Sequence, residues 1–540
     1  MGKSDDKTNV CRVLDQKKVP YKTHVCPDAE GLSGDEIAAV LNENPAQAFK
    51  TLVTVGKNGK NYVFVVPVNK ELDLKKAAKA VGEKSIEMIK SKELLPLTGY
   101  VHGGCSPIGM KKFFPTTFHK TAADFETIMF SAGKIGHQVE VKIRIMKLRV
   151  PFYYDQFHCI TSECKDNCCV GGWEIDIDDD TYNYYMSLEG ELGDRIREAI
   201  TKSEDGSNCF KLIDGHCGLL DDCGLCTIHK ELGAEHLSVV CDQFPRYSEY
   251  YGEIKESGIG LACEEAERII FSENKTFTTV LKPCDEEYSE DDEYDSVYAV
   301  KIFKARDKIF RILDMTEMSI NEKLVVILKF CASMQEYIND DDFDGLKEYV
   351  NAFGRSDIEH ILMEMNDESE SDEFDDIDVQ ECIRSIMYAY EDMEVLNTRW
   401  EQMLADMAEI FHDNMDNEQY QEMEDEFMTA MLEREYEYRN FITYLVFRYF
   451  AKSVYDYDVV GKAKMFITNY LMLRQMDMLV WYKKHKKFTF DDRIDTAHIF
   501  SRQVEYSEDN MEALYESFLF DDVFETNNLC KLLWIDSTAL

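Results

Sequence analysis

The stretch Cys159-Ile-Thr-Ser-Glu-Cys164-Lys-Asp-Asn-Cys168-Cys169 places four thiols within eleven residues. It opens a segment, Cys159 to Cys284, that holds eleven of the seventeen cysteines and around which the body of the chain is organised. Short spacings let several thiolates reach one soft metal centre at a small loop-closure cost. The adjacent pair suits an iron–sulfur cluster at least as well as a zinc ribbon, whose knuckles have the form of Cys223-Gly-Leu-Cys226.

Disulfide bonds and unrelated buried thiols are the alternatives to metal binding. The N-terminal sequence lacks the apolar core of a signal peptide, and no run of about 18 apolar residues suggests a membrane span. We therefore expect a cytoplasmic protein, in which thiols stay reduced. Clustered cysteines in a reducing compartment favour metal ligands or redox groups over disulfides.

Charge is distributed unevenly along the chain. Its 540 residues are too many for one hydrophobic core and suggest about three to four domains. Residues 1–146 carry a net charge of +6, and residues 147–540 carry −50. The basic part suits a polyanion such as RNA. The acidic part repels a polyanion and suits a basic protein substrate, although solvated helix surface explains most of its charge more simply.

The first 146 residues alternate between helix and strand signals. Ser33-Gly-Asp-Glu36 is a capping box that begins a helix, and Asn58-Gly59 between two β-rich runs is typical of a hairpin. The pattern predicts a compact α+β domain. Its expected helices span 7–18, 34–42 and 72–81, and its expected strands span 21–25, 49–55, 61–68, 127–131 and 139–145.

A glycine-rich stretch from Leu97 to Lys112 reads LTGYVHGGCSPIGMKK. Four glycines in eleven residues either serve turns or let a ligand approach the backbone. Exposed amides at Gly103 and Gly104 would suit a carboxylate, a phosphate or an ester oxygen.

Together with Ala48-Phe-Lys50-Thr-Leu and Ser131-x-Gly-Lys134-x-Gly136, this stretch resembles the YbaK/EbsC-type Cys-tRNA(Pro) deacylases, relatives of the prolyl-tRNA editing domain. The resemblance covers about residues 5–146. It implies a mixed sheet flanked by helices and a hydrolase or lyase that releases cysteine from the 3′ end of mischarged tRNA without a metal. The catalytic positions that it implies are Lys50, Gly103 and Gly104, and the substrate-binding positions are Tyr100, Ser106, Ser131 and Lys134.

The expected chemistry needs no nucleophile from the protein. An aminoacyl ester is already activated, so positioning and polarisation of the carbonyl can suffice. The resemblance implies that the substrate thiol attacks its own ester and that Lys50 holds the substrate or the tRNA terminus. Gln138 stands where some relatives carry Asp, and Cys105 stands where an aliphatic residue is usual. Cys105 is either a plain buried thiol or a group that modifies substrate choice.

The region 148–285 carries a second set of motifs, namely Cys-x4-Cys-x3-Cys-Cys before Gly-Trp173, Leu-Cys226-x-Ile-His229-x-Glu-Leu-Gly, Cys241-x3-Pro-Arg and Cys263-x-Glu-Ala. This set resembles the flagellin lysine N-methylase (FliB-like) family. The resemblance implies an iron–sulfur cluster of the 4Fe–4S type and S-adenosylmethionine-dependent methylation of lysines in a protein such as flagellin. The cysteines that match are Cys159, Cys164, Cys168, Cys169, Cys217, Cys226, Cys241 and Cys263.

Eight thiols exceed the roughly four that one cluster requires. Either two centres form, or some of these cysteines are structural. His229 is a candidate ligand or a hydrogen-bonded structural histidine, and Cys209, Cys223 and Cys284 look local to this chain. No glycine-rich fingerprint indicates where S-adenosylmethionine would bind.

Residues 286–540 contain no proline and show helical periodicity, which predicts an all-α bundle that completes the FliB-like module. Acidic runs at 285–295 and 367–378 are expected to be exposed linkers or loops. The expected helices span 297–313, 322–337, 379–411, 418–436, 438–454 and 463–483.

These observations predict a fusion enzyme in which an aminoacyl-tRNA deacylase is joined to an iron–sulfur lysine methylase-like module. The alternative is a fusion without catalysis, in which a tRNA-binding domain is joined to a metal-stabilised interaction scaffold.

Overall fold

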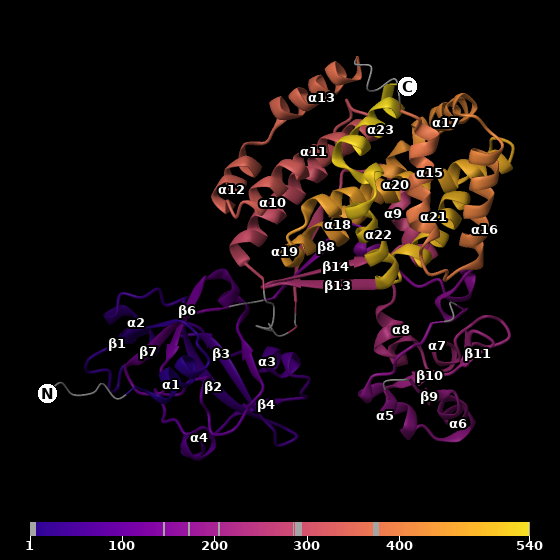
Figure 1. The fold of residues 1–540 in the computed structure, drawn as a ribbon. Helices are drawn as coiled ribbons and strands as arrows, with labels where there is room; N and C mark the ends of the chain where they lie inside the picture. The colour runs from indigo at the N-terminus through magenta and orange to yellow at the C-terminus, as the bar shows by residue number, and fades with distance from the viewer. Residues whose placement is uncertain are drawn as a thin grey trace. The chain divides into compact units, whose positions relative to one another are not determined.

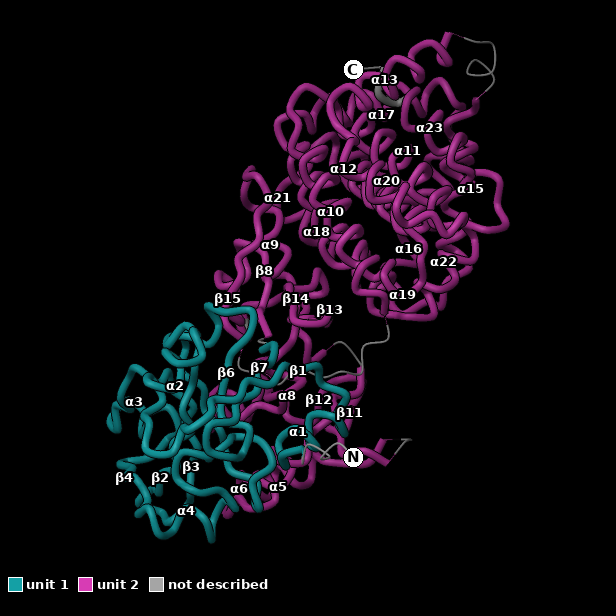
Figure 2. Tube along the Cα trace, turned by 90° about the vertical axis from the view of Figure 1, so that its left-hand side faces the viewer, with its two compact units in different colours: residues 1–145 teal, residues 146–540 magenta. Residues whose placement is uncertain are grey.

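The computed structural model describes residues 7–143, 146–170, 173–203, 206–284, 286, 294–370 and 377–538. The chain divides into two compact units, residues 1–145 and 146–540 (Figure 2). The cysteine-rich region and the helical region belong to the same unit. No helix in the described ranges is long and apolar enough to cross a membrane.

The first unit is built on a seven-stranded mixed sheet (Figure 1). Its strand order is β1-β7-β6-β2-β3-β5, and β4 pairs with β2. Asn58-Gly59 turns β2 into β3, and Ser33 and Glu36 form the expected capping box at the start of α2. The elements are α1 (Asn9–Gln16), β1 (Tyr21–Val25), α2 (Gly34–Val40), β2 (Ala48–Gly56), β3 (Asn61–Pro67), α3 (Leu74–Ala80), β4 (Ile86–Met88), α4 (Ser91–Thr98), β5 (Thr116–Phe118), β6 (Thr127–Ser131) and β7 (His137–Lys142). This arrangement confirms the predicted mixed sheet with helices.

Two apolar layers cover the two faces of this sheet. On one face, Val10 and Leu14 of α1 pack on Phe49, Val53 and neighbouring strand residues. On the other face, Ala77 and Ala78 of α3 pack on Phe64 and Val66. Alternation along β2 and β3 sends successive side chains into these two layers, which explains why both strands are largely apolar.

The second unit begins with a four-stranded sheet that the sequence analysis did not predict. Its order is β13-β14-β8-β15, formed by β8 (Lys147–Pro151), β13 (Arg246–Tyr251), β14 (Ile254–Ile259) and β15 (Thr279–Pro283). Buried Glu256 on β14 accepts hydrogen bonds from Arg306 at 2.5 and 2.7 Å and from Arg149 at 2.8 Å. These charge-assisted bonds join the sheet to the first helix of the bundle.

A small lobe lies between β8 and β13 in the chain. Its core contains Ile175, Ile177, Tyr185, Ile196 and Phe210. Asp178 caps α5, since its carboxylate accepts from the amide of Thr181. The helices of the lobe are α5 (Asp179–Ser187), α6 (Gly190–Glu198), α7 (Thr227–Glu231) and α8 (Val239–Gln243), and α9 (Glu264–Ser272) follows β14.

The remainder is all helical, as predicted. A continuous core runs through it, with α11 and α20 at its centre (Figure 1). The helices are α10 (Ser296–Leu313), α11 (Ile320–Asn339), α12 (Phe343–Ala352), α13 (Arg355–Ser369), α15 (Val379–Glu391), α16 (Thr398–Met407), α17 (Asn417–Met431), α18 (Glu435–Tyr449), α19 (Ser453–Asp456), α20 (Val459–Lys483), α21 (Phe490–Val504), α22 (Glu508–Phe520) and α23 (Thr526–Thr538).

Two predictions in this region were wrong, one of a helix and one of a loop. The single helix expected over 379–411 is two helices, because the connecting amides of Glu394 and Leu396 donate to the side chains of Asn510 and Gln503 instead of continuing a helix. The acidic run at 367–378 was expected to be a loop, but its first residues end α13. Residues 371–376, and most of the run at 285–295, lie outside the described residues.

Candidate functional site

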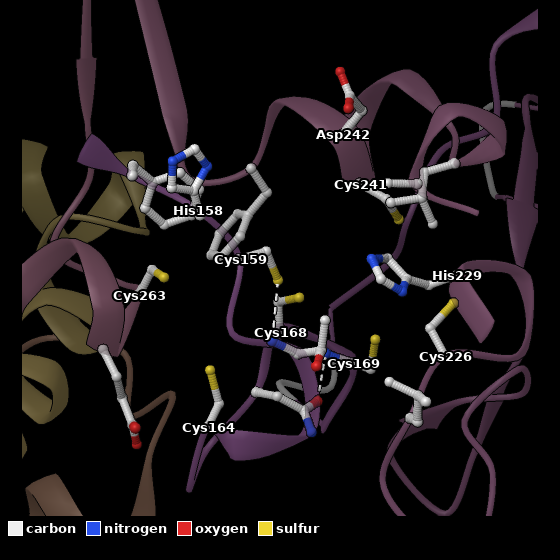
Figure 3. Close-up of a pocket in the computed structure, with 18 of the residues that line it drawn as sticks. His158, Cys159, Cys164, Cys168, Cys169, Cys226, His229, Cys241, Asp242 and Cys263 are labelled. Atoms are coloured by element: carbon white, nitrogen blue, oxygen red, sulfur yellow. Dashed lines mark hydrogen bonds between the residues drawn. The ribbon is translucent and has the colours of Figure 1, made fainter. Parts of the chain in front are cut away.

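Seven of the eight predicted cysteines line one cavity of about 400 Å³ in the second unit (Figure 3). They come from four separate places in the chain. Cys159, Cys164, Cys168 and Cys169 belong to the loop after β8, Cys226 immediately precedes α7, Cys241 lies on α8, and Cys263 immediately precedes α9. The fold therefore gathers thiols that are separated by up to about a hundred residues.

The thiols form two groups within this cavity. Burial raises the pKa of Cys164 to about 12, and the nearby groups Cys263, Glu264, Cys159 and Cys168 add to the increase. Burial also raises the pKa of Cys241 to about 12, with smaller contributions from Cys168, Cys226 and Cys217. Figure 3 shows Cys226 and Cys241 close to His229, away from Cys164 and Cys263.

The pair Cys168-Cys169 stands between the two groups. A hydrogen bond from Cys169 lowers the pKa of Cys168 to about 7, while the same bond and burial raise the pKa of Cys169. One thiolate is therefore accessible near neutral pH, whereas the other buried thiols need a positive charge nearby to ionise. A metal ion supplies such a charge, because it binds the deprotonated form.

The predicted cysteine that does not line the cavity is Cys217. It is buried on β12 (His216–Cys217), in the core of the small lobe. Cys209 is also buried, Cys223 is exposed, and neither lines the cavity. Within the described ranges, no three Cys, His, Asp or Glu side chains are placed so as to hold a metal ion. The cavity has the soft donors that a metal needs, but the ligand set is not fixed by geometry.

The loop that carries the first cysteines is attached to the helical bundle by a group of charges. The carboxylate of Glu264 accepts from the amides of Lys165 and Asp166 at 3.2 and 3.1 Å. Arg502 on α21 binds the Asp166 carboxylate at 2.9 Å and its carbonyl oxygen at 3.2 Å. These bonds hold the loop between Cys164 and Cys168 against α9 and α21.

His498, one turn before Arg502, completes this attachment. Its ring lies 3.5 Å from the Asp166 carboxylate and 3.4 Å from that of Glu267. Burial opposes a charge on His498, but the two carboxylates outweigh it and raise its pKa to about 9. This attachment could not be predicted, because Asp166 and Glu264 stand at unspecified positions within the cysteine motifs and more than 330 positions separate Asp166 from Arg502.

In the first unit, Lys50 lies on β2 level with the end of β6. The strands are parallel, with Ala48 opposite Met129 and Phe49 opposite Phe130, so Lys50 and Ser131 share a sheet face. Lys50 Nζ donates to the carbonyl oxygen of Val68 at 3.2 Å and to Glu71 at 3.3 Å. The Glu71 side chain is 96% exposed, so this ion pair is weak and an anionic ligand can replace it.

Gln138 extends the same polar row across the sheet. It lies opposite Ser131 on β7, and its buried side-chain oxygen has no hydrogen-bond partner among the described residues. Ser131 Oγ accepts from the amide of Gly133 at 3.2 Å, and Lys134 is exposed on the turn that follows. Lys50, Ser131 and Gln138 therefore form one polar surface at this end of the sheet.

The glycine-rich loop packs against that turn. Gly104 is buried, and an added Cβ would lie 3.3 Å from the amide nitrogen of Ile135. Its amide donates to the carbonyl oxygen of Val101 at 3.0 Å, so the expectation of two exposed amides is wrong for Gly104. Gly103 is exposed and has a φ of 80°, a left-handed conformation that favours glycine.

Two predicted substrate-binding residues hold the loop together instead of projecting from it. Tyr100 is buried and donates to the carbonyl oxygen of Ile108 at 2.6 Å. Ser106 is fully buried, and its hydroxyl accepts from the amide of Ile108 at 3.4 Å. Cys105 is buried beside them, and burial raises its pKa to about 11, which makes it a protonated thiol at neutral pH.

Comparison with known proteins agrees with this division of the chain. The aminoacyl-tRNA editing domain matches residues 29–148, and the FliB lysine N-methylase C-terminal domain matches residues 306–532. The first unit is 49% identical over 140 residues to the "Putative Cys-tRNA(Pro)/Cys-tRNA(Cys) deacylase EbsC" of Enterococcus faecalis, covering 26% of this chain and 85% of that protein.

The chain is also similar to two proteins of Salmonella. The chain is 32% identical over 121 residues to the flagellar biosynthetic protein FliU of Salmonella muenchen, covering 21% of this chain and 71% of that protein. It is 25% identical over 203 residues to the lysine-N-methylase of Salmonella typhimurium, covering 36% of this chain. The match covers 48% of that methylase, about half of its length.

The chain is thus a fusion of an aminoacyl-tRNA editing domain with a lysine N-methylase-like body. It belongs to the EbsC-type deacylase family through its first unit and to the FliB lysine N-methylase family through its second.

The attachment of the cysteine loop leads to a prediction about Arg502. Replacing it by methionine should accelerate amide hydrogen exchange between residues 164 and 170 at least tenfold, because breaking a partly buried ion pair costs more than ~1.4 kcal/mol. Hydrogen-exchange mass spectrometry on this peptide measures the effect. Arg399→Met is the matched control. Arg399, on α16, forms an exposed ion pair with Asp495 of α21, the helix that carries Arg502. Equal exchange in both variants would contradict the proposed anchoring.

Proposed function

We propose that the first unit hydrolyses Cys-tRNA(Pro). The observation that carries this proposal is the position of Lys50, which lies level with Ser131 at the end of β6 and is held there by a weak ion pair. The 49% identity to EbsC supports the same activity. The net charge of +6 in this part of the chain suits a tRNA.

The proposed reaction uses the substrate as its own nucleophile. The cysteinyl sulfur attacks its ester carbonyl carbon, the bond from that carbon to the ribose oxygen breaks, and the ribose oxygen takes the thiol proton. The acyl group leaves as a four-membered cysteine thiolactone, and water then opens its carbon–sulfur bond to give cysteine with a free carboxylate and a free thiol. Lys50 exchanges its bond to Glu71 for the negative charge of the substrate, and the exposed backbone at Gly103 lets the ester approach closely. Buried, protonated Cys105 takes no part.

This proposal predicts that Lys50→Ala loses at least a hundredfold in the rate of Cys-tRNA(Pro) deacylation, since a positioned charge at a reacting centre contributes roughly 2.7 kcal/mol or more. Release of radiolabelled cysteine from the purified charged tRNA is the measurement. Lys60→Ala, in the hairpin turn of the same sheet, should keep the wild-type rate. Unchanged turnover in Lys50→Ala would remove this residue from the mechanism.

We further propose that the second unit holds an iron–sulfur cluster in the cysteine-lined cavity and methylates protein lysines with S-adenosylmethionine. The cavity supports this proposal, since seven matching thiols line about 400 Å³ of space. Cys159, Cys164, Cys168 and Cys263 would hold the cluster, and Cys169, Cys217, Cys226 and Cys241 form a second group of thiols next to it. When bound, such a cluster supplies a redox-active centre and a positive charge for the buried thiolates.

Substitution tests this ligand set. Cys168→Ser with Cys169→Ser should remove the absorbance near 400 nm of anaerobically purified protein and most of its iron, because Cys168 is one of the proposed ligands and the change at Cys169 removes the adjacent thiol that could replace it. Cys284→Ser, which changes a cysteine outside the cavity, is the control and should keep its iron. Wild-type iron content in the double variant would exclude the pair as ligands.

A transfer assay tests the methylase directly. The cluster-replete protein should move the labelled methyl group of S-adenosylmethionine to lysine side chains of flagellin. The acidic body, at −50, favours a basic stretch of substrate. Mass spectrometry of the product identifies the modified residues, and chemically acetylated flagellin is the control. No transfer to flagellin by iron-replete protein would contradict this part of the proposal.

A further inference from the structure

A second, smaller cavity of about 250 Å³ adjoins the cysteine-lined one. Phe244 and Arg246 line both cavities. The smaller one lies where the end of α21 and the start of α22 meet α18 and strand β13. Its lining residues are Phe244, Pro245, Arg246, Tyr247, Gly260, Arg448, Glu505, Tyr506 and Glu508.

Glu505 brings an unpaired acceptor to this cavity. Its side chain is fully buried, with 0% exposure. One carboxylate oxygen, Oε2, accepts from the hydroxyls of Tyr444 and Tyr449 at 2.8 and 2.9 Å and from Arg448 at 3.0 Å. The other oxygen, Oε1, is buried and has no hydrogen-bond partner among the described residues. A buried carboxylate oxygen without a donor is costly, so this atom indicates a missing ligand group.

Arg448 brings unused donors to the same place. Both of its hydrogen bonds within the described part of the chain come from Nη1, which donates to Glu505 and to the Tyr444 hydroxyl. The guanidinium lies over the Tyr247 ring, 4.6 Å from its centroid. Nη2 and Nε remain for a planar anion, and a guanidinium binds a carboxylate through two such parallel bonds.

Gly260 keeps the space in front of Arg448 open. A Cβ on this residue would lie 3.5 Å from Nη1 of Arg448 and 3.2 Å from the carbonyl oxygen of Pro245. A Cβ here would therefore be tight against the Pro245 carbonyl oxygen and in ordinary van der Waals contact with the guanidinium, where it would occupy space that a ligand could use. Glycine at this buried position therefore leaves room for a ligand beside Arg448.

We propose that this cavity binds the α-amino-carboxylate end of S-adenosylmethionine, a proposal that rests on the methylase function proposed above. The Arg448 guanidinium takes the carboxylate and Glu505 Oε1 takes the ammonium. Adjacent opposite charges select a zwitterion, because Arg448 repels a simple cation such as a lysine ammonium and Glu505 repels a simple anion.

The size and surroundings of the cavity agree with this ligand. About 250 Å³ is enough for an amino-acid moiety, and the cavity is open, so the rest of the ligand can extend beyond it. The Phe244 and Tyr506 rings, 6.2 Å apart, stand at the wall of the cavity, and Trp173 packs on both. Trp173 in turn donates to the carbonyl oxygen of Cys168 at 2.8 Å, so the ligand would lie close to the cysteine loop.

Calorimetric binding to the full-length, iron-replete protein tests this assignment. The probes are S-adenosylmethionine and methylthioadenosine, which keeps the nucleoside and sulfur but lacks the amino-acid end. Glu505→Gln should weaken binding of S-adenosylmethionine at least tenfold, because the carboxamide presents a donor or a neutral acceptor where an ammonium needs a carboxylate. Gly260→Ala should do the same, because its Cβ would occupy space in front of Arg448 and lie tight against the carbonyl oxygen of Pro245. Neither variant should change the affinity for methylthioadenosine.

Tyr298→Phe, which removes a buried hydroxyl on α10 outside the cavity, is the matched control and should bind both probes as the wild type does. Glu505→Gln and Gly260→Ala proteins that bind S-adenosylmethionine with wild-type affinity would overturn the assignment and leave the methylase proposal intact. A wild-type protein that binds no S-adenosylmethionine would overturn both. Binding that is lost as expected, without methyl transfer, would contradict the methylase proposal alone.

Discussion

An ion pair between Arg502 and Asp166 determines where the cysteine loop lies on the helical bundle. Four closely spaced thiols on a short loop would otherwise be free to turn toward solvent, because the loop has little apolar content of its own. Arg502, together with Glu264 and His498, fixes the loop through its backbone and one carboxylate. The thiols of α8 and α9 can then face the same cavity. The helical region is therefore part of the cysteine site, although it contributes none of the eight matching cysteines.

The two units carry different kinds of candidate site. The editing unit has a half-buried lysine whose ion-pair partner is exposed, together with a glycine-rich loop. This arrangement suits an activated ester that needs only to be held and polarised. The acidic unit has partly buried thiols, and burial raises the pKa of several of them, which suits a site that is completed by a positively charged metal. Neither arrangement requires the other.

Local signals predicted much of the fold. The capping box at Ser33 and Glu36, the hairpin at Asn58-Gly59 and the strand Tyr21–Val25 depend on neighbouring residues, and all three are present. The break between α15 and α16 was missed because side chains more than a hundred positions away, Asn510 and Gln503, satisfy its amides. The sheet β13-β14-β8-β15 was missed for a similar reason, since β15 pairs with β8 across about 130 residues.

The cysteine site, like the fold, could be predicted from the sequence only in part. Spacing and resemblance indicated the matching cysteines, and seven of them line one cavity. The charged residues that anchor them, and the pair formed by Arg448 and Glu505, could not be predicted, because no sequence motif joins residues of α18 and α21 to a loop that begins near residue 159. Such pairs depend on the packing of distant helices.

Metal and sulfide analysis of the anaerobically purified wild-type chain, with its absorption spectrum, tests the central claim most directly. The cavity and its thiols predict iron with an equal amount of acid-labile sulfide and a broad band near 400 nm. Zinc alone, or no metal, would contradict the claim that the cysteine-lined cavity is an iron–sulfur site. The second unit would then be a scaffold, and the deacylase would be the activity that the structure still supports.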